Sequence, residues 1–246
     1  MLSFKWSLVL PLVSLTAVIS TVPYAQQSSV TLISSVDLPG YTGDFDHFAV
    51  DYDRNRLLLA AEDHGTLEVF DLKTSDHLRT VGGFGNPHSI LVRRGVPTVF
   101  ITDSSKLGPT IRNANTYSMR KSVPLTPGSD TAKYDPATNI LYVVTGGKDV
   151  DMKTANLEAV NPDTGAKLAS LTFPDNHVEA MAFVEGDPRI FINLTQTNKL
   201  AVVDRRGMRS LPPGQYRQRS RTPWWPSMPR SIASTSCAAA QAWWSC

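Results

Sequence analysis

The stretch NILYVVTGGKD, residues 139–149, decides the fold, because its outline returns three more times along the chain. In it an apolar run ends in a glycine pair and a charged loop. Similar runs with small polar loops are RLLLAAEDHG from Arg56, TVFITDSSKLG from Thr98 and RIFINLTQTNK from Arg189. Their aligned apolar positions are spaced by 42, 42 and 49 residues: Leu57, Val99, Leu141 and Ile190. A repeat of this period indicates a propeller or a solenoid.

Each repeat contains four short strand candidates separated by turn signals, and no segment keeps a helical period for ten residues. In the first repeat the candidates are HFAVD, RLLLAAE, TLEVFDL and HLRTV. The turns between strands, such as DYDRN and DPATN, have the Asp, Asn and Pro that tight turns require. Four antiparallel strands in about 40 residues are typical of a propeller blade. The sequence therefore predicts an all-β propeller, with a sandwich of irregular strands as the less favoured alternative.

The segments HFAVDYDRNRLLLAAEDHG, PHSILV and KYDPATNILYVVTGGKD resemble the YncE-like β-propellers built from YVTN repeats. The run Tyr142-Val143-Val144-Thr145 nearly spells the motif, and the resemblance covers about residues 30–208. It implies a seven-bladed ring in a secreted or periplasmic protein. The chain supplies about four recognisable blades: full ones at 43–86, 87–129 and 130–176, and a partial fourth from His177.

This shortage of blades predicts an incomplete propeller, a truncated copy of the family fold. An open set of blades would leave apolar faces and sheet edges uncovered. One interpretation is therefore that the chain is a non-functional truncated copy. The segment VTLISSVDL, residues 30–38, is a further strand candidate, which in a closed ring would complete the last blade.

The first 25 residues have the pattern of a secretory signal peptide. Lys5 precedes an apolar run from Trp6 to Ile19, and a cleavage point follows Ala25. An uncleaved membrane anchor is the alternative, although the run is slightly short for one. No other segment could span a bilayer. We therefore expect a periplasmic or secreted protein with no other membrane contact, whose partial propeller occupies residues 26–209.

The last part of the chain differs from everything before it. After Asp204 there is no acidic residue, but there are seven arginines, four of the five tryptophans and both cysteines. Removing those seven charges from the formal net charge of +2 leaves −5 for residues 1–204, so nucleic acid is not an expected partner. Cys237 and Cys246 could pair in an oxidising compartment. We hypothesise that residues 210–246 are an aberrant basic tail, translated out of frame and disordered.

Candidate functional residues follow from strand direction. Antiparallel strands reverse, so the start of each first strand and the loop between the second and third strands lie on one face of the propeller. Loops on one face are where function concentrates. The first-strand starts also include Thr131, and the loops Asp103, Lys148, Asp149 and Asp151. We expect the ligand-binding residues near the channel mouth to be His47, His88, His177, Glu179, Asp46, Glu62, Asp63 and His64.

The chemistry of this face has three interpretations. Neutral imidazole with carboxylates would suit a divalent metal such as Zn or Ca, the one cofactor that the sequence suggests. A histidine near a carboxylate could equally act as general base for a water that attacks a lactone or ester. The third and favoured interpretation is that these side chains cap strand ends and bond exposed backbone groups. No P-loop, dinucleotide fingerprint, HExxH or GxSxG motif is present.

Two functions are compatible with this pattern. The first is a non-enzymatic binding or scaffold protein whose ligand is a small molecule, a protein or a polysaccharide. The second is a hydrolase similar to propeller lactonases, with a metal or histidine site at the channel mouth. Only fold analogy supports the hydrolase, so the binding protein is our prediction. Of the remaining residues, His77 is expected to be a solvated turn residue, and four aromatics to fill the core between blades: Phe70, Phe100, Tyr142 and Phe191.

Overall fold

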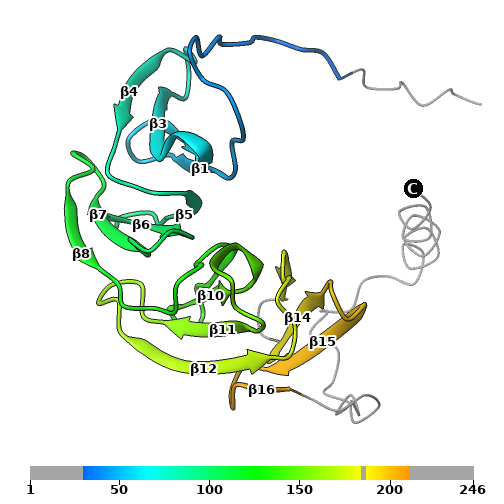
Figure 1. The fold of residues 1–246 in the computed structure, drawn as a ribbon. Coiled ribbons are helices and arrows are strands. Elements are labelled where there is room, and N and C mark those ends of the chain that lie inside the picture. Colours follow the sequence, from blue (N-terminus) through cyan, green and yellow to red (C-terminus); the bar gives the residue numbers. More distant parts are fainter. Residues whose placement is uncertain (1–29, 184–186, 211–246) are drawn as a thin grey trace, which may run out of the picture. The chain divides into compact units, whose positions relative to one another are not determined.

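The computed structural model describes residues 30–183 and 187–210 (Figure 1). The predicted signal peptide, residues 1–25, and the tail from residue 211, with Cys237 and Cys246, lie outside these residues. The chain divides after Ser35, and the unit that begins at Val36 contains every described strand. Within the two described ranges, no helix is long and apolar enough to cross a membrane.

The described residues form four antiparallel sheets of four strands, each made of consecutive strands. We call each sheet a blade. The first blade contains β1 (Phe48–Asp51), β2 (Arg56–Ala61), β3 (Thr66–Asp71) and β4 (His77–Val81). The second contains β5 (Pro87–Val92), β6 (Thr98–Asp103), β7 (Thr110–Asn113) and β8 (Met119–Ser122). The third contains β9 (Ala132–Asp135), β10 (Ile140–Gly146), β11 (Ala155–Val160) and β12 (Lys167–Phe173). The fourth contains β13 (Met181–Ala182), β14 (Arg189–Leu194), β15 (Lys199–Asp204) and β16 (Arg209–Ser210).

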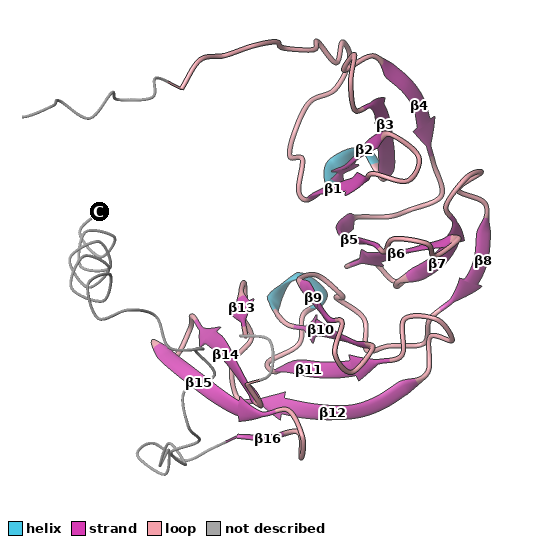
Figure 2. Ribbon diagram, turned by 180° about the vertical axis from the view of Figure 1, so that it is seen from behind, coloured by secondary structure: helices cyan, strands magenta, loops and turns pink. Residues whose placement is uncertain are grey.

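These sheets confirm the predicted all-β, four-bladed organisation. Each falls inside the repeat unit that the sequence predicts, and in each the strands pair in chain order. The first strands are neighbours from blade to blade: β1 lies beside β5, β5 beside β9, and β9 beside β13 (Figure 2). Short 3-10 helices occupy the second-to-third loops of the first and third blades: η1 (Glu62–His64) and η2 (Lys148–Val150).

A repeated side-chain turn ends the third strand of each blade. In the first blade, Asp71 Oδ1 accepts hydrogen bonds from the backbone N–H groups of Lys73 (2.8 Å) and Thr74 (3.0 Å). Asn113 and Asn161 accept the equivalent pair of bonds in the second and third blades. In the fourth, Asp204 accepts one from the residue two positions on. Asp and Asn favour this local bond, which explains why they recur where the chain must turn.

The apolar core lies between successive blades. Leu58 and Val69 of the first blade pack in one buried cluster with Val99 and Ile101 of the second. Corresponding clusters join the second blade to the third and the third to the fourth. The predicted core positions Phe70, Phe100 and Tyr142 are buried, whereas Phe191 is half-buried. Each blade therefore buries apolar side chains against its neighbour. A single repeat could not bury this apolar face alone, so it depends on the adjacent repeats for stability.

Buried charged side chains also join the blades. The Arg112 guanidinium donates hydrogen bonds to the carbonyl oxygens of Gly82 (3.3 Å), Gly83 (2.8 Å) and Tyr117 (3.3 Å). It also lies 3.8 Å from the ring centroid of Phe84, a favourable cation–π distance. Through these contacts, Arg112 of the second blade holds the linker that follows the first blade.

The predicted strand at residues 30–38 is wrong. These residues form no strand, and the side chains of Val30, Leu32 and Ile33 are exposed. A strand is stabilised by pairing with a neighbouring strand, and none of the described sheets includes this segment. A strand-like sequence alone is therefore not enough to form a strand here.

The prediction for His77 is correct in part: the residue is exposed, but it lies in a strand and not in the turn. His77 begins β4, and its Nε2 lies 2.7 Å from Oε2 of the buried Glu68. The hydroxyls of Thr66 and Thr80 donate to the same carboxylate, each at 2.6 Å. A buried carboxylate requires such partners, and His77 is one of them.

Candidate functional site

The starts of the first strands meet because β1, β5 and β9 are neighbours. Asp46 precedes β1, and its N–H donates to Ala60 O (2.9 Å) on the adjacent strand β2. Asp130 precedes β9 and makes the equivalent bond to Val144 O (3.0 Å) on β10. The two aspartates thus occupy the same position in the first and third blades, and the second blade lies between them. His88 of β5 projects from that second blade.

The buried imidazole of His88 is the centre of the site. Its Nδ1 lies 2.5 Å from Asp46 Oδ2 and 3.5 Å from Asp130 Oδ1. Its Nε2 lies 2.9 Å from Ser104 Oγ and 3.7 Å from Glu62 Oε1. Only 8% of His88 is exposed. Three carboxylates, from the first and third blades, therefore surround one histidine of the second; we call these four residues and Ser104 the His88 cluster.

The pKa values follow from this crowding. Burial acts to lower the pKa of His88, but the hydrogen bond to Asp46 and the charges of Asp130 and Glu62 raise it overall. Burial acts to raise the pKa of Asp46, but hydrogen bonds from His47 and His88 outweigh it, so this pKa lies well below its usual range. His47 Nδ1 is 2.6 Å from Asp46 Oδ1, and this contact raises the pKa of His47.

The other two carboxyl groups are harder to ionise. Burial raises the pKa of Asp130 to about 6; the His88 charge opposes the rise, while the charges of Asp46 and Glu179 add to it. Burial also raises the pKa of Glu62. The cluster therefore gathers carboxyl and imidazole groups with perturbed pKa values in one place, and such groups are concentrated at functional sites.

Ser104 is positioned by the residue before it. Asp103 ends β6 with its side chain buried, and its carboxylate accepts from the backbone N–H groups of Gly85 (2.8 Å), Asn86 (3.1 Å) and Ser105 (2.9 Å). Ser104 N–H donates to Asn86 O at 3.0 Å. These bonds fix the loop so that the Ser104 hydroxyl faces His88.

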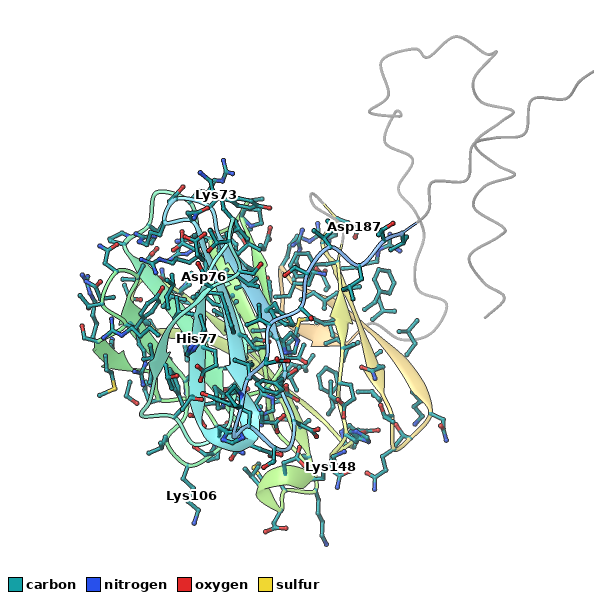
Figure 3. The ribbon with its side chains drawn as sticks, turned by 90° about the horizontal axis from the view of Figure 1, so that it is seen from above. Lys73, Asp76, His77, Lys106, Lys148 and Asp187 are labelled. Atoms are coloured by element: carbon teal, nitrogen blue, oxygen red, sulfur yellow. The ribbon has the colours of Figure 1, made fainter. Side chains whose placement is uncertain are left out.

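A groove of about 630 Å³ opens beside the cluster. Its lining includes Glu62, Asn86, Ser104, Lys106 and Asp151. Figure 3 shows Lys106 and Lys148 on one face of the molecule and Lys73 on the opposite one. The groove therefore opens on the face that carries the second-to-third loops, where the sequence predicts the ligand-binding residues.

The predicted site residues separate into three groups. Asp46, His47, Glu62 and His88 come together as described. His177 Nε2 contacts Glu179 Oε1 and lies 2.8 Å from Lys148 Nζ, so these residues make a second group in the third and fourth blades.

The third group, Asp63 and His64, has contacts to the backbone. Asp63 Oδ2 accepts from Asp44 N–H (2.8 Å), and His64 Nε2 lies 2.9 Å from Thr42 N and 2.8 Å from Thr42 O. These two side chains hold the segment before β1 against η1. For them the predicted capping role describes the contacts that the structure shows.

Sequence reasoning omitted two members of the cluster, Asp130 and Ser104. A signal exists for each. Asp130 precedes Thr131 as Asp46 precedes His47, and Ser104 follows the predicted loop residue Asp103. As for a metal, Asp46, Glu62 and His88 each offer a ligand atom within 4.8 Å of the others. This spacing and this donor set are compatible with a divalent cation.

Solved structures with the same arrangement of strands are β-propellers. One is the dihydro-heme d1 dehydrogenase NirN in complex with DHE, with 14% identity and a TM-score of 0.56, over 68% of this chain and 37% of that one. Another is the WD40 β-propeller domain of Doa1, with 12% identity and a TM-score of 0.50, over 65% and 49%. The described residues are blades of a β-propeller. The chain spans less than half the length of either protein. No family model and no curated protein matches it.

Proposed function

We propose that this chain is a YncE-like β-propeller that is secreted or periplasmic and binds a small cationic ligand at the His88 cluster. The observation that supports the ligand class is the gathering of Asp46, Glu62 and Asp130 around one buried histidine. Burial raises the pKa of Asp130, and the charges of Asp46 and Glu179 add to the rise; a cation bound beside these carboxyl groups would favour their ionised forms.

The size of the groove favours a small molecule over a protein or a polysaccharide. Its volume of about 630 Å³ lies within the range of small-molecule sites. Its lining also includes the acidic residues Glu62 and Asp151, which extend the negative field of the cluster. Nucleic acid would be repelled by the same charges.

Binding can be tested by calorimetry with choline as the cationic probe and succinate as the anionic one. We expect saturable binding of choline and none of succinate. Asp130→Asn and Glu62→Gln should each weaken choline binding by about 10-fold, as expected for one lost charge contact. Asp76→Asn, in the β3–β4 turn, is the matched control and should bind as the wild type does. Equal affinity in all variants, or no choline binding at all, would contradict the proposal.

The cellular location has its own test. If residues 1–25 are a cleaved signal peptide, the mature protein begins at Gln26. Mass spectrometry of protein purified from the secreted or periplasmic fraction should find that N-terminus. An intact Met1 in soluble protein would contradict secretion.

A further inference from the structure

Asp46, His88 and Ser104 form a continuous chain of hydrogen bonds. A proton on His88 Nδ1 is donated to Asp46 Oδ2 at 2.5 Å, which leaves Nε2 to accept the Ser104 hydroxyl proton at 2.9 Å. A nucleophile bonded to a base, which is itself oriented by a carboxylate, is the arrangement that activates serine in hydrolases of unrelated folds.

We propose that Ser104 is the nucleophile of an esterase site, with His88 as its general base and Asp46 as the residue that orients His88. The substrate class is a neutral or cationic carboxylic ester or lactone. This choice of charge depends on the proposed function, since Glu62 and Asp130 beside His88 would repel an anionic ester.

The Ser104 hydroxyl is accessible to such a substrate. Ser104 is half-buried and lines the groove, whereas His88 behind it is buried. The same groove is lined by Asn86 and Lys106, whose side chains make no hydrogen bond or ion pair within the described part of the chain. Both are donors, so either could stabilise the oxygen anion that develops during acyl transfer.

The reaction balances with water as the only other reactant. Ser104 Oγ attacks the ester carbon while its proton passes to His88 Nε2. The tetrahedral intermediate expels the alcohol oxygen, which takes that proton, and an acyl group remains on Ser104. Water then attacks the acyl carbon, its proton passes to His88 Nε2, and the acid leaves as Ser104 regains the proton. The products are one acid and one alcohol, and for a lactone a single hydroxy acid.

The test uses the full chain with p-nitrophenyl acetate and, separately, a fluorophosphonate that labels activated serines. We expect a burst of p-nitrophenol, one phosphonate per chain, and its mapping to Ser104 by peptide mass spectrometry. Ser104→Ala should abolish labelling, and Ser104→Ala and His88→Gln should lower kcat/KM by at least about 10³-fold. Ser122→Ala, on the exposed strand β8, is the control and should match the wild type.

Several outcomes would overturn the inference: no labelling of folded wild type, labelling at another residue, or turnover unchanged in Ser104→Ala. Loss of turnover in EDTA, with recovery on adding Zn²⁺ or Ca²⁺, would also overturn it in favour of a metal site. Circular dichroism of each variant shows whether it is folded. Choline binding without labelling would leave the proposed binding function standing alone, and labelling without choline binding would refute only the ligand class.

Discussion

Asp46 Oδ2 lies 2.5 Å from Nδ1 of His88, a contact that joins the segment before β1 to the first strand of the second blade. The two residues are 42 positions apart, which is one repeat. Because the partner of Asp46 is in the next blade, the site exists only when the blades are packed together.

This contact predicts how activity depends on pH. His88 must be neutral to accept a proton, and its raised pKa places the rising limb of kcat/KM above the ordinary histidine value near 6.5. Asp46→Asn removes the charge that raises this pKa. The rising limb of kcat/KM should therefore move to lower pH, while the plateau value of kcat/KM falls. The pH profile of ester hydrolysis measures both effects. A limb that stays in place would show that Asp46 does not act on His88.

Asp130→Asn should stabilise the protein at neutral pH. The folded pKa of about 6 exceeds the ordinary value of 3.8, so the folded state binds the proton more tightly than the unfolded state. Stability therefore falls as pH rises from about 4 to about 6. We expect the variant to gain about 1–3 kcal/mol above pH 6 and little near pH 4. The groups that face Asp130 are His88, Asp46, Glu179 and His47. Urea unfolding at both pH values measures the difference, and a variant less stable at pH 7 would refute it.

Arg112→Ala should destabilise the protein by about 2–4 kcal/mol, because it leaves the carbonyls of Gly82, Gly83 and Tyr117 without their donor. The matched control is Arg120→Ala on the exposed strand β8, which should change stability by less than about 0.5 kcal/mol. Thermal and urea unfolding give both values. Equal effects of the two substitutions would mean that the buried arginine does not hold the first two blades together.

Glu68→Ala should be similarly destabilising at pH 7, by about 2–4 kcal/mol, since three polar partners lose their acceptor. Burial acts to raise the pKa of Glu68, but hydrogen bonds from Thr66, Thr80, Tyr41 and His77 lower it overall. The folded state therefore gains stability above the ordinary value near 4.5, and this gain is lost as pH falls below it. Asp37→Ala, at an exposed position, is the control. A Glu68 variant as stable as that control at pH 7 would contradict the structure around His77.

The blades could be predicted from sequence because their signals are local. Aligned apolar runs at Leu57, Val99, Leu141 and Ile190 lie in β2, β6, β10 and β14. An Asp or Asn ends β3, β7 and β15 and directly follows β11. The prediction of a strand at residues 30–38 was wrong because a strand must pair with another part of the chain. A local sequence pattern does not show whether such a partner exists. The contact of His77 with Glu68 was missed for a similar reason, since Glu68 is buried by the fold.

The candidate face was predictable from strand direction, but its pairings were not. Spacing places His88 and Glu179 at equivalent strand starts, with His177 beside Glu179. Yet His88 gathers three carboxylates, whereas His177 contacts Glu179 and Lys148. Which side chains meet depends on rotamers and on the angle between blades. Ser104 carries no motif at all, because its role rests on a contact with His88 across the β5–β6 strand pair.

Long-range ¹H–¹⁵N NMR of His88, at a pH above its titration midpoint, tests the Ser104–His88–Asp46 arrangement most directly, because it shows which ring nitrogen carries the proton. We expect a proton held on Nδ1 by Asp46 and an unprotonated Nε2 that faces Ser104, with that preference lost in Asp46→Ala. A proton found on Nε2 in the wild type, or a tautomer unchanged by removing Asp46, would contradict the arrangement on which the proposed chemistry rests.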